Sequence, residues 1–264
     1  METPLTGAAA LYLYGIVAHP LQLPPCDAVE TGTAIDLIAG DRVGCVVSPV
    51  LARDYAASAT GRTAAEQLDW VTPRAWRHHD VVRQLHLTTT VIPLKFGTVC
   101  GSAGDVHDLL DRCSGQICAL LDRFRGRDEW TLSIRIDSDR VIERLEREDP
   151  ELRELCAVQQ TLPDGRSYFV RKKRQQRGRE LLAAAIASMT GEVCARIVGH
   201  VDGCFEDTSA APAAMLLVDR ARFDELTTRL AALEADFTNN GLALELRGPW
   251  APYSFVKGEL RVGN

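Results

Sequence analysis

A single polar break divides this chain of 264 residues into two patterned halves. The break is the glycine-bearing segment FRGRDE at 124–129, and before it apolar residues recur at the spacing of an amphipathic helix. Directly after it, from Trp130 to Ile136, apolar and polar residues alternate with the period of a strand. Domain boundaries fall in polar linkers of this kind. We therefore predict two domains, residues 1–127 and 128–247, followed by a tail, residues 248–264.

Strands open the first domain. Residues 11–17 and 43–50 are β-branched and aromatic runs bounded by glycine and proline, and a further strand between them enters a Gly-Asp turn. A helical pattern then covers residues 54–87 with an expected break at Pro73, and VIPLKFG at 91–97 returns to a strand. One long amphipathic helix is expected to close the domain, with a capping box at its start and an apolar stripe that continues to Phe124.

The second half predicts an order of strand, two helices, two strands, helix and strand. The ranges are 130–137, 139–158, 167–194, 195–202, 213–219, 221–237 and 242–247. If the two consecutive helices form one crossover, this is the βαββαβ order of the ferredoxin-like fold. We predict an α+β protein of two domains, each a sheet with helices packed on one face, the C-terminal one ferredoxin-like. An exposed sheet face or edge is then a candidate protein-binding surface.

Composition disfavours several classes of partner and cofactor. A formal net charge of −6 predicts no nucleic acid and no acidic membrane as partner, because such binding depends on neutralising phosphates. No Lys or Arg precedes the first apolar run and no stretch approaches about 18 apolar residues, so we expect neither signal peptide nor spanning helix, and a cytoplasmic protein. The eight cysteines include no CxxC pair, so we expect no metal and no cofactor.

No motif predicts catalysis. The glycine-rich segment at 96–105 matches neither the dinucleotide nor the P-loop pattern, and it places Asp105 where a phosphate would bind. His78 and His79 point about 100° apart on a helix, so they do not share a metal ion. We therefore expect no enzyme and no catalytic residues. An enzyme built around Cys100 and a histidine is kept as an alternative, and it predicts a thiol of unusually low pKa.

Residues 166–179 form the most basic segment of the chain. The segment at 143–154 is strongly acidic, and two antiparallel helices of opposite charge would neutralise each other along their exposed sides. We prefer this structural interpretation. The alternative is an RNA-binding ferredoxin-like module that uses Arg171 to Arg179, although the predicted strands lack the aromatic pattern of an RNA-binding sheet.

Three separated motifs carry a resemblance to a known family. They are YLYGIV near the N-terminus, the helix with His78 that leads into TTTVIPLKFGTVC, and the closing RGPWAPYSFV. Spread in this order from Tyr12 to Val256, they resemble the gas vesicle protein L/F family (GvpL/GvpF). The chain departs from the usual family pattern at Lys95, where arginine is more frequent, and at Ala251, where proline is more frequent.

The resemblance implies a non-enzymatic accessory protein of gas vesicle assembly. Such a protein would bind the small hydrophobic shell protein, through the N-terminal domain, and other vesicle proteins, as assembly chaperone or minor structural component of the gas vesicle. The physics agrees, because a shell subunit with a large apolar area aggregates unless a partner covers it. Carried over from the matching motifs, the partner-binding residues would be Arg74, His78, Lys95 and Phe96.

The tail segment GPWAPYSF at 248–255 is expected to act as a clamp. Its prolines restrict the backbone, and its aromatic side chains lose little entropy on docking. We expect regular structure to end at its first two residues and the segment to fold back near the strand at 91–97, locking the two domains together. The clamp residues would be Gly248, Pro249, Trp250, Pro252, Tyr253 and Phe255. The alternative is that the aromatic residues grip the shell protein directly.

Overall fold

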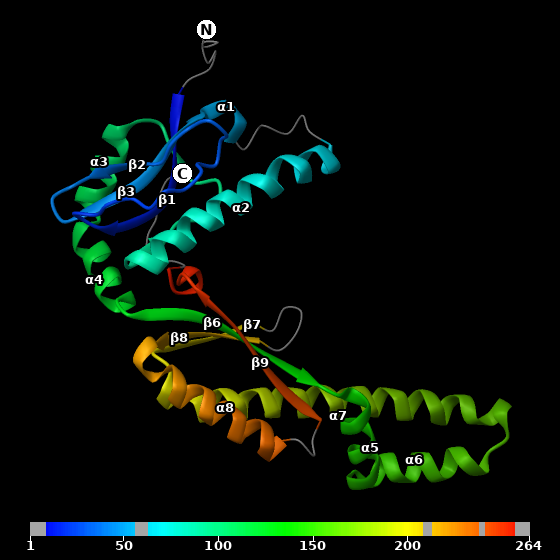
Figure 1. Ribbon diagram of the computed structural model, residues 1–264. Helices are drawn as coiled ribbons and strands as arrows, with labels where there is room; N and C mark the ends of the chain where they lie inside the picture. The colour runs from blue at the N-terminus through cyan, green and yellow to red at the C-terminus, as the bar shows by residue number, and fades with distance from the viewer. Residues whose placement is uncertain (1–8, 56–62, 208–212, 238–240, 257–264) are drawn as a thin grey trace. The chain divides into compact units, whose positions relative to one another are not determined.

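The computed structural model of the chain describes residues 9–55, 63–207, 213–237 and 241–256 (Figure 1). Its contacts divide the chain into two compact units. Unit 1 is Met1–Glu129 together with Pro249–Asn264, and unit 2 is Trp130–Gly248. The chain passes between the units twice, within strand β6 (Arg127–Ile136) and within strand β9 (Leu242–Trp250).

A five-stranded antiparallel sheet forms the centre of unit 1. The order is β2-β3-β1-β4, with β5 also paired to β1. The strands are β1 (Ala9–Ala18), β2 (Asp36–Ala39), β3 (Val43–Leu51), β4 (Val91–Pro93) and β5 (Val99–Cys100). Strand β1 has an irregularity at Tyr14, because Leu13 pairs with Val47 whereas Gly15 pairs with Val46. The extra residue lets Tyr14 join Tyr12 in one core cluster.

Helices cover both faces of this sheet. Every residue of β1 from Tyr12 to Val17 is buried, and successive side chains of a strand point to opposite faces. Helix α2 (Ala64–Thr88) contacts β1 and β4, whereas α3 (Ala103–Arg112) and α4 (Ser114–Phe124) contact β1, β2, β3 and β4 between them (Figure 1). The expectation of helices on one face only is therefore wrong for unit 1.

Helix α2 continues through Pro73, so the expected break there is wrong. A proline ring removes one main-chain N–H from a helix and leaves a carbonyl one turn earlier without its donor. Side chains on either side of this point supply hydrogen bonds to the helix backbone: Thr72 Oγ1 donates to the Leu68 carbonyl, and Arg74 donates to the Trp70 carbonyl. Packing of the second half of α2 against the sheet then outweighs the local preference of proline.

The long helix expected up to Phe124 is two helices. Cys113, with φ −105° and ψ 8°, ends α3 and precedes α4. Serine and glycine follow it, and both have lower helix propensity than the residues around them. At the start of α3 the spacing of the sequence is confirmed, because the Asp105 N–H donates to Ser102 Oγ at 3.2 Å.

The helix expected at 139–158 is also two helices, α5 (Ser138–Glu148) and α6 (Pro150–Thr161). Asp149 ends the first and caps the second, accepting a hydrogen bond from the Leu152 N–H at 2.8 Å. Proline fits the first turn of a helix but cannot continue one. The Asp-Pro pair is therefore a boundary signal that the periodicity of the segment concealed.

Unit 2 has the ferredoxin-like topology that the sequence predicts. Its four-stranded sheet has the order β7-β8-β6-β9, where β7 is Gly203–Asp207 and β8 is Ala213–Asp219. Helices α5, α6 and α7 (Asp164–Ile197) connect the first two strands, and α8 (Phe223–Phe237) connects the last two. The first strand of the unit thus lies between the third and the fourth, as this fold requires.

Two boundaries in unit 2 differ from the expectation. The strand expected at 195–202 is wrong: α7 continues to Ile197 because Met189, Val193 and Ile197 repeat every four residues and are all buried in the core. The last strand continues to Trp250, so Gly248 and Pro249 do not end the regular backbone. Gly248 has φ 155°, a conformation that side-chain-bearing residues rarely adopt.

Among the described residues, one stretch is long and apolar enough to span a membrane by length and composition. It is Ser167–His200, most of which belongs to helix α7. The second half of this stretch contributes side chains to the core of unit 2. It packs into the core of unit 2 against strands β6 and β8 and helix α8, through Met189, Val193, Cys194 and Ile197. Figure 1 shows α7 and α8 on one side of the sheet of unit 2.

Candidate functional site

Segments far apart in the sequence meet around His78 in unit 1. The imidazole is 4% exposed, and the ring of Tyr14 stacks on it with centroids 5.8 Å apart. Phe96 meets it edge-on at 5.9 Å, and the ring of Tyr253 in the tail lies 6.4 Å away. Helix α2, strand β1, the turn after β4 and the tail are therefore tied together at one buried side chain.

Both nitrogens of this imidazole are within hydrogen-bond distance of tyrosine hydroxyls. The Gly97 N–H donates to Tyr12 Oη at 3.0 Å, and Tyr12 Oη lies 2.9 Å from His78 Nδ1. Tyr253 Oη lies 3.3 Å from the other ring nitrogen, Nε2. Both nitrogens of His78 are engaged inside the fold.

Burial keeps this cluster uncharged near neutral pH. Desolvation lowers the pKa of His78 to about 4, against the opposing effect of a backbone hydrogen bond with Leu94. Desolvation also raises the pKa of Tyr12 and of Tyr253 well above the usual value for tyrosine. A general base needs a pKa near the operating pH. The geometry of His78 is therefore that of a core polar residue, which positions the segments around it.

Arg74 is bound to its own unit through Glu30. Its Nε and one terminal nitrogen donate to the two carboxylate oxygens at 2.9 and 2.7 Å, and the guanidinium lies 4.5 Å from the ring centroid of Trp70. Tyr55, in the short helix α1 (Ala52–Tyr55), donates its hydroxyl to Glu30 at 2.8 Å. Although burial raises it, the hydrogen bonds from Arg74 and Tyr55 hold the pKa of Glu30 below its usual value.

The tail is anchored to unit 1 by polar and apolar contacts. Ser254 donates its N–H and its hydroxyl to the two carboxylate oxygens of Glu129 at 2.8 and 2.9 Å. Phe255 is 5% exposed, and Ala251 is buried in the same core cluster as Tyr12. These contacts belong to unit 1 alone, so the expected clamp between the domains stays a prediction.

The four residues carried over as partner-binding differ in exposure. Lys95 is exposed, Phe96 is partly buried against the core, Arg74 is half-buried and His78 is buried. Strand β4 ends at Pro93, so Lys95 and Phe96 lie in a turn rather than in the strand expected at 91–97. The Thr98 N–H closes this turn on the Lys95 carbonyl at 3.1 Å, and Gly97 takes φ 84° within it.

The outer side of α2 carries exposed apolar residues that sequence reasoning missed. Trp76 is 69% exposed, and Leu87, about three turns further on, is 60% exposed. His79 follows Trp76 by three residues, and its ring lies 5.9 Å from that of Trp250 in the tail. We call Trp76, His79, Leu87 and Trp250 the α2 surface. The sequence did offer a signal for this surface, because Trp76 and Leu87 are apolar but lie outside the helical stripe that faces the sheet.

The described residues contain no group of three or more histidine, cysteine or acidic side chains able to hold a metal ion. The Cys100 thiol does not have the lowered pKa that the enzyme alternative predicts. Burial and the nearby carboxylate of Asp105 raise the pKa of the Cys100 thiol, whereas a reactive cysteine needs a lowered pKa. This thiol is therefore held in its unreactive, protonated form.

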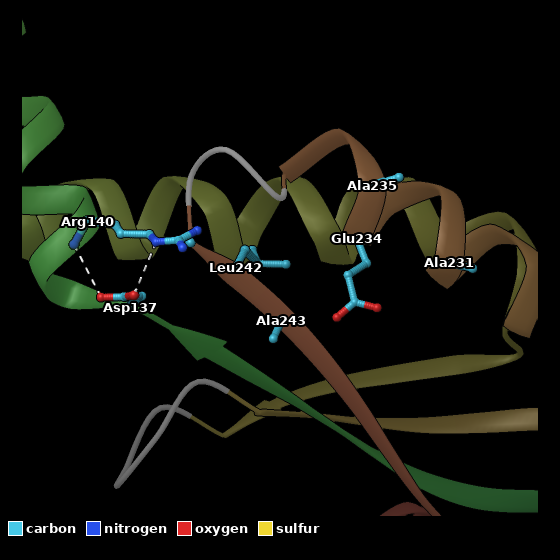
Figure 2. A pocket seen from close by; sticks show the side chains of 8 residues that line it. Asp137, Arg140, Ala231, Glu234, Ala235, Leu242 and Ala243 are labelled. Atoms are coloured by element: carbon cyan, nitrogen blue, oxygen red, sulfur yellow. Dashed lines mark hydrogen bonds and ion pairs between the residues drawn. The ribbon is translucent and has the colours of Figure 1, made fainter.

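A pocket of about 580 Å³ opens in unit 2 beside the start of α5, the second half of α8 and the start of β9. Figure 2 shows Asp137 paired with Arg140, whose Nε lies 3.5 Å from the carboxylate. Glu234 accepts a hydrogen bond from the Leu244 N–H at 3.2 Å. The other lining residues are small or apolar: Ala231, Ala235, Gly241, Leu242 and Ala243. The charged groups of this pocket are engaged in holding helix ends and strand together.

Ion pairs along α7 confirm that part of the basic segment neutralises its acidic neighbours. Lys173 pairs with Glu151 at 3.0 Å, and Arg177 pairs with Asp149 at 3.0 Å. Arg174 pairs with Glu146 and also donates to Gln159. Helices α5 and α6 and the cap residue between them supply these partners, as complementary helix faces predict.

Comparison with known sequences identifies relatives over most of the chain. Residues 10–257 match the family described as "Gas vesicle synthesis protein GvpL/GvpF". The chain is 29% identical over 210 residues to gas vesicle protein L of Streptomyces sp. (strain CB03234), which covers 74% of this chain and 73% of that protein. It is 25% identical over 236 residues to gas vesicle protein L of Haloferax mediterranei, covering 83% of this chain and 70% of that one.

Solved structures share the fold. The crystal structure of GvpF from Anabaena sp. PCC7120 has a TM-score of 0.68 at 18% identity and covers 94% of this chain and 96% of that chain. GvpF from Microcystis aeruginosa has a TM-score of 0.64 at 17% identity, covering 94% and 99%. The structural likeness shows the α+β fold, and the sequence match spans nearly the whole chain. This protein therefore belongs to the GvpL/GvpF family of gas vesicle proteins.

Proposed function

We propose that this protein holds the small hydrophobic shell protein of the gas vesicle through unit 1 during assembly. Membership of the GvpL/GvpF family supports a role in gas vesicle assembly and carries the proposal. The matched family is a family of gas vesicle proteins and is not a known enzyme family. The finer assignment, to shell-protein binding by unit 1, rests on the surface that this unit presents.

The α2 surface has the composition of a binding site for an apolar partner. Trp76 and Trp250 are large side chains with few rotatable bonds, and tryptophan is enriched among residues that dominate binding energy. His79 contacts Trp250, which brings the helix and the tail into one surface. Covering apolar area of the shell subunit would keep that subunit from aggregating.

Residues beneath the α2 surface fix its shape. His78 connects α2 to the tail through Tyr253, and Arg74 holds α2 to Glu30. Phe96 packs against His78, which leaves Lys95 exposed at the neighbouring turn. In this proposal Arg74, His78 and Phe96 act from within, and Lys95 and Trp250 contact the partner. The protein acts in the cytoplasm, as assembly chaperone or as a minor component of the vesicle, and also meets other vesicle accessory proteins.

The test is co-expression with the small shell protein of the same gas vesicle, followed by affinity purification of the soluble fraction. We expect the two chains to co-purify. Trp76→Ala should reduce the recovered shell protein about tenfold, in line with the loss of an interface tryptophan. Leu68→Ala is the matched control, because Leu68 lies on the same helix, is 66% exposed and is outside the α2 surface.

Two results would contradict the proposal. If the shell protein aggregates regardless and nothing co-purifies with the unaltered chain, the direct partner is another accessory protein. If Trp76→Ala and Trp250→Ala both recover as much shell protein as Leu68→Ala, the shell protein binds elsewhere on the chain.

A further inference from the structure

Helix α7 of unit 2 uses only part of its basic residues for the ion pairs with α5 and α6. Arg171, Lys172 and Arg179 make no ion pair with any residue in the part of the chain that the structure describes. Arg171 has one ring contact, with its guanidinium 5.9 Å from the ring centroid of Tyr168. Three cations on one helix are therefore available to an anionic partner.

These cations line two adjoining grooves. The first, of about 330 Å³, runs along α7 and is lined by Tyr168, Arg171, Lys172, Gln175, Gln176 and Arg179. Their three- and four-residue spacing places them on one side of the helix. The second, of about 420 Å³, lies between α5, α6 and α7 and shares three of these residues, Arg171, Gln175 and Arg179. We call the two together the α7 groove.

Part of the α7 groove is apolar. Ile142 of α5, Leu152 of α6 and Leu182 of α7 line it, and Leu152 is 1% exposed. A charged ligand without apolar surface would gain nothing from these side chains. A ligand with both carboxylates and apolar side chains would match the whole groove.

Gly178 leaves an empty position in this groove. It is buried and lines the groove, yet a Cβ at this residue would meet no atom within 4 Å. A glycine inside a helix costs about 1 kcal/mol relative to alanine. No close contact requires glycine here, so its effect is to keep space open, and that space has room for a side chain from a partner.

We propose that the α7 groove binds an acidic amphipathic helix of a partner protein. The carboxylates of such a helix would pair with Arg171, Lys172 and Arg179, and its apolar side would place a large side chain over Gly178. A helix in a groove between helices is a recurring mode of peptide recognition. This site is separate from the α2 surface and does not depend on shell-protein binding by unit 1.

The same observations favour a protein helix over a nucleic acid. Binding of nucleic acid gains most of its affinity from phosphates neutralised by many cations. Among the described residues that line the groove, three cations make no ion pair, Glu146 lines the same groove, and the chain carries a net charge of −6.

The probe is a fluorescein-labelled synthetic peptide of about 20 residues, which spans about 30 Å as a helix. Leucines occupy positions i, i+3, i+4 and i+7, and glutamates occupy the opposite side. Binding to the full-length protein is followed by fluorescence anisotropy. Comparison probes are a scrambled peptide of the same composition, the same pattern with lysine in place of glutamate, and a single-stranded RNA of similar length. We expect the acidic amphipathic peptide to bind at least about tenfold more tightly than each of them.

Gly178→Leu fills the groove and provides the sharpest variant. We expect it to weaken peptide binding about tenfold or more. Gly191→Leu is the matched control, because Gly191 lies on the same helix, is exposed, and also has no atom within 4 Å of an added Cβ. This control should bind the peptide within about twofold of the unaltered chain.

Charge is tested with Arg171→Gln and Arg179→Gln combined. The matched double variant is Arg42→Gln with Arg229→Gln, two exposed residues outside the groove with the same total change of charge. We expect the first pair to weaken binding about tenfold and to reduce its dependence on salt. Circular dichroism of each variant checks that the helices remain folded.

The proposal is overturned by any of several results. One is that the unaltered chain does not bind the acidic peptide, or binds the scrambled peptide equally well. Another is that the Gly178→Leu variant binds the acidic peptide as tightly as the Gly191→Leu variant does. Tighter binding of the RNA, lost in the Arg171 and Arg179 double variant, would assign the surface to nucleic acid instead.

Discussion

His78 is held neutral by its surroundings, and this has a consequence for stability. Its ring is 4% exposed, and both nitrogens are bonded to tyrosine hydroxyls. Burial lowers its pKa from 6.5 to about 4 in the folded protein. Between these values the unfolded chain binds a proton that the folded chain does not. The stability contributed at this site is therefore complete above pH 6.5 and is lost as the pH falls towards 4.

We predict that lowering the pH from 7.5 to 5.0 removes about 2 kcal/mol from the unfolding free energy of unit 1 through His78. The pKa of Glu30 is lowered from 4.5, so this carboxylate titrates below that interval. Urea unfolding followed by tryptophan fluorescence measures the change, since Trp70, Trp76 and Trp250 all belong to unit 1. His78→Gln should be less stable at pH 7.5 but should lose about 2 kcal/mol less on acidification. Equal losses in both proteins would show that His78 is not the group responsible.

The residues of this cluster can be recognised in the sequence, but the sequence does not show that they are buried. The motifs with His78, Phe96 and the tail are recognisable one by one. The resemblance implies partner binding for His78 and Phe96, whereas the tail is expected to act as a clamp. The side chains that hydrogen-bond to the buried His78 are those of Tyr12 and Tyr253, which lie 66 and 175 residues away in the sequence. Contacts of that separation leave no local pattern. Exposure at Trp76 could have been predicted better, since an apolar residue off the core seam of a helix has only solvent or a partner to face.

Strand β1 shows how one element depends on a single small residue. Gly15 lies beside the irregularity at Tyr14, where the strand passes close to β4. A Cβ at Gly15 would come within 2.7 Å of Val91 Cγ2 and 3.0 Å of the Ile92 carbonyl oxygen. The second of these atoms is main chain and cannot move aside without disturbing the sheet.

Gly15→Ala is therefore expected to destabilise unit 1 by about 2 kcal/mol or more, because overpacking forces backbone shifts. Gly115→Ala is the control. Gly115 is in helix α4 with no atom within 4 Å of an added Cβ, so alanine there should be neutral or stabilise by about 1 kcal/mol. Urea unfolding of both variants measures the two effects. Equal stability of the variants would mean that the sheet accommodates a methyl group at this point.

Periodicity predicts the existence of most elements and misses their ends. The strands at 11–17 and 43–50 and the helix at 221–237 are confirmed within a few residues. Pro73 and Pro150 show why local rules alone do not place boundaries. The first proline lies within a helix that packs on the sheet, and the second begins a helix after an aspartate cap. Proline is inside a helix at position 73 because packing on the sheet stabilises that helix, and it begins a helix at position 150 because an aspartate cap precedes it.

At the scale of the whole molecule, each unit has a hydrophobic core of its own. The core of unit 2 contains residues of β6, β8, β9 and helices α5, α7 and α8, and that of unit 1 includes Ala251 of the tail. The ferredoxin-like order could be predicted because most strands and helices of unit 2 have a recognisable pattern in the sequence, although the second strand lies at Gly203–Asp207 and not at 195–202. The sequence also predicts that the tail folds back on the first domain. The polar partner of the tail could not be predicted, because Glu129 and Ser254 are 125 residues apart in the sequence.

Removing residues 250–264 tests what the tail contributes to the molecule. The truncated chain loses the Ser254 hydrogen bonds to Glu129, the Tyr253 bond to His78 and buried Phe255. We expect unit 1 to lose about 3 to 5 kcal/mol, as for deletion of a buried aromatic side chain. Hydrogen exchange read by mass spectrometry should then show faster exchange in β1 and α2. A chain lacking only residues 257–264 keeps all of these contacts and serves as control.

If β8 and α8 also exchange faster, the tail locks the two units together as a clamp; if they do not, its role is confined to unit 1. Unchanged exchange in both units would mean that these contacts add no stability.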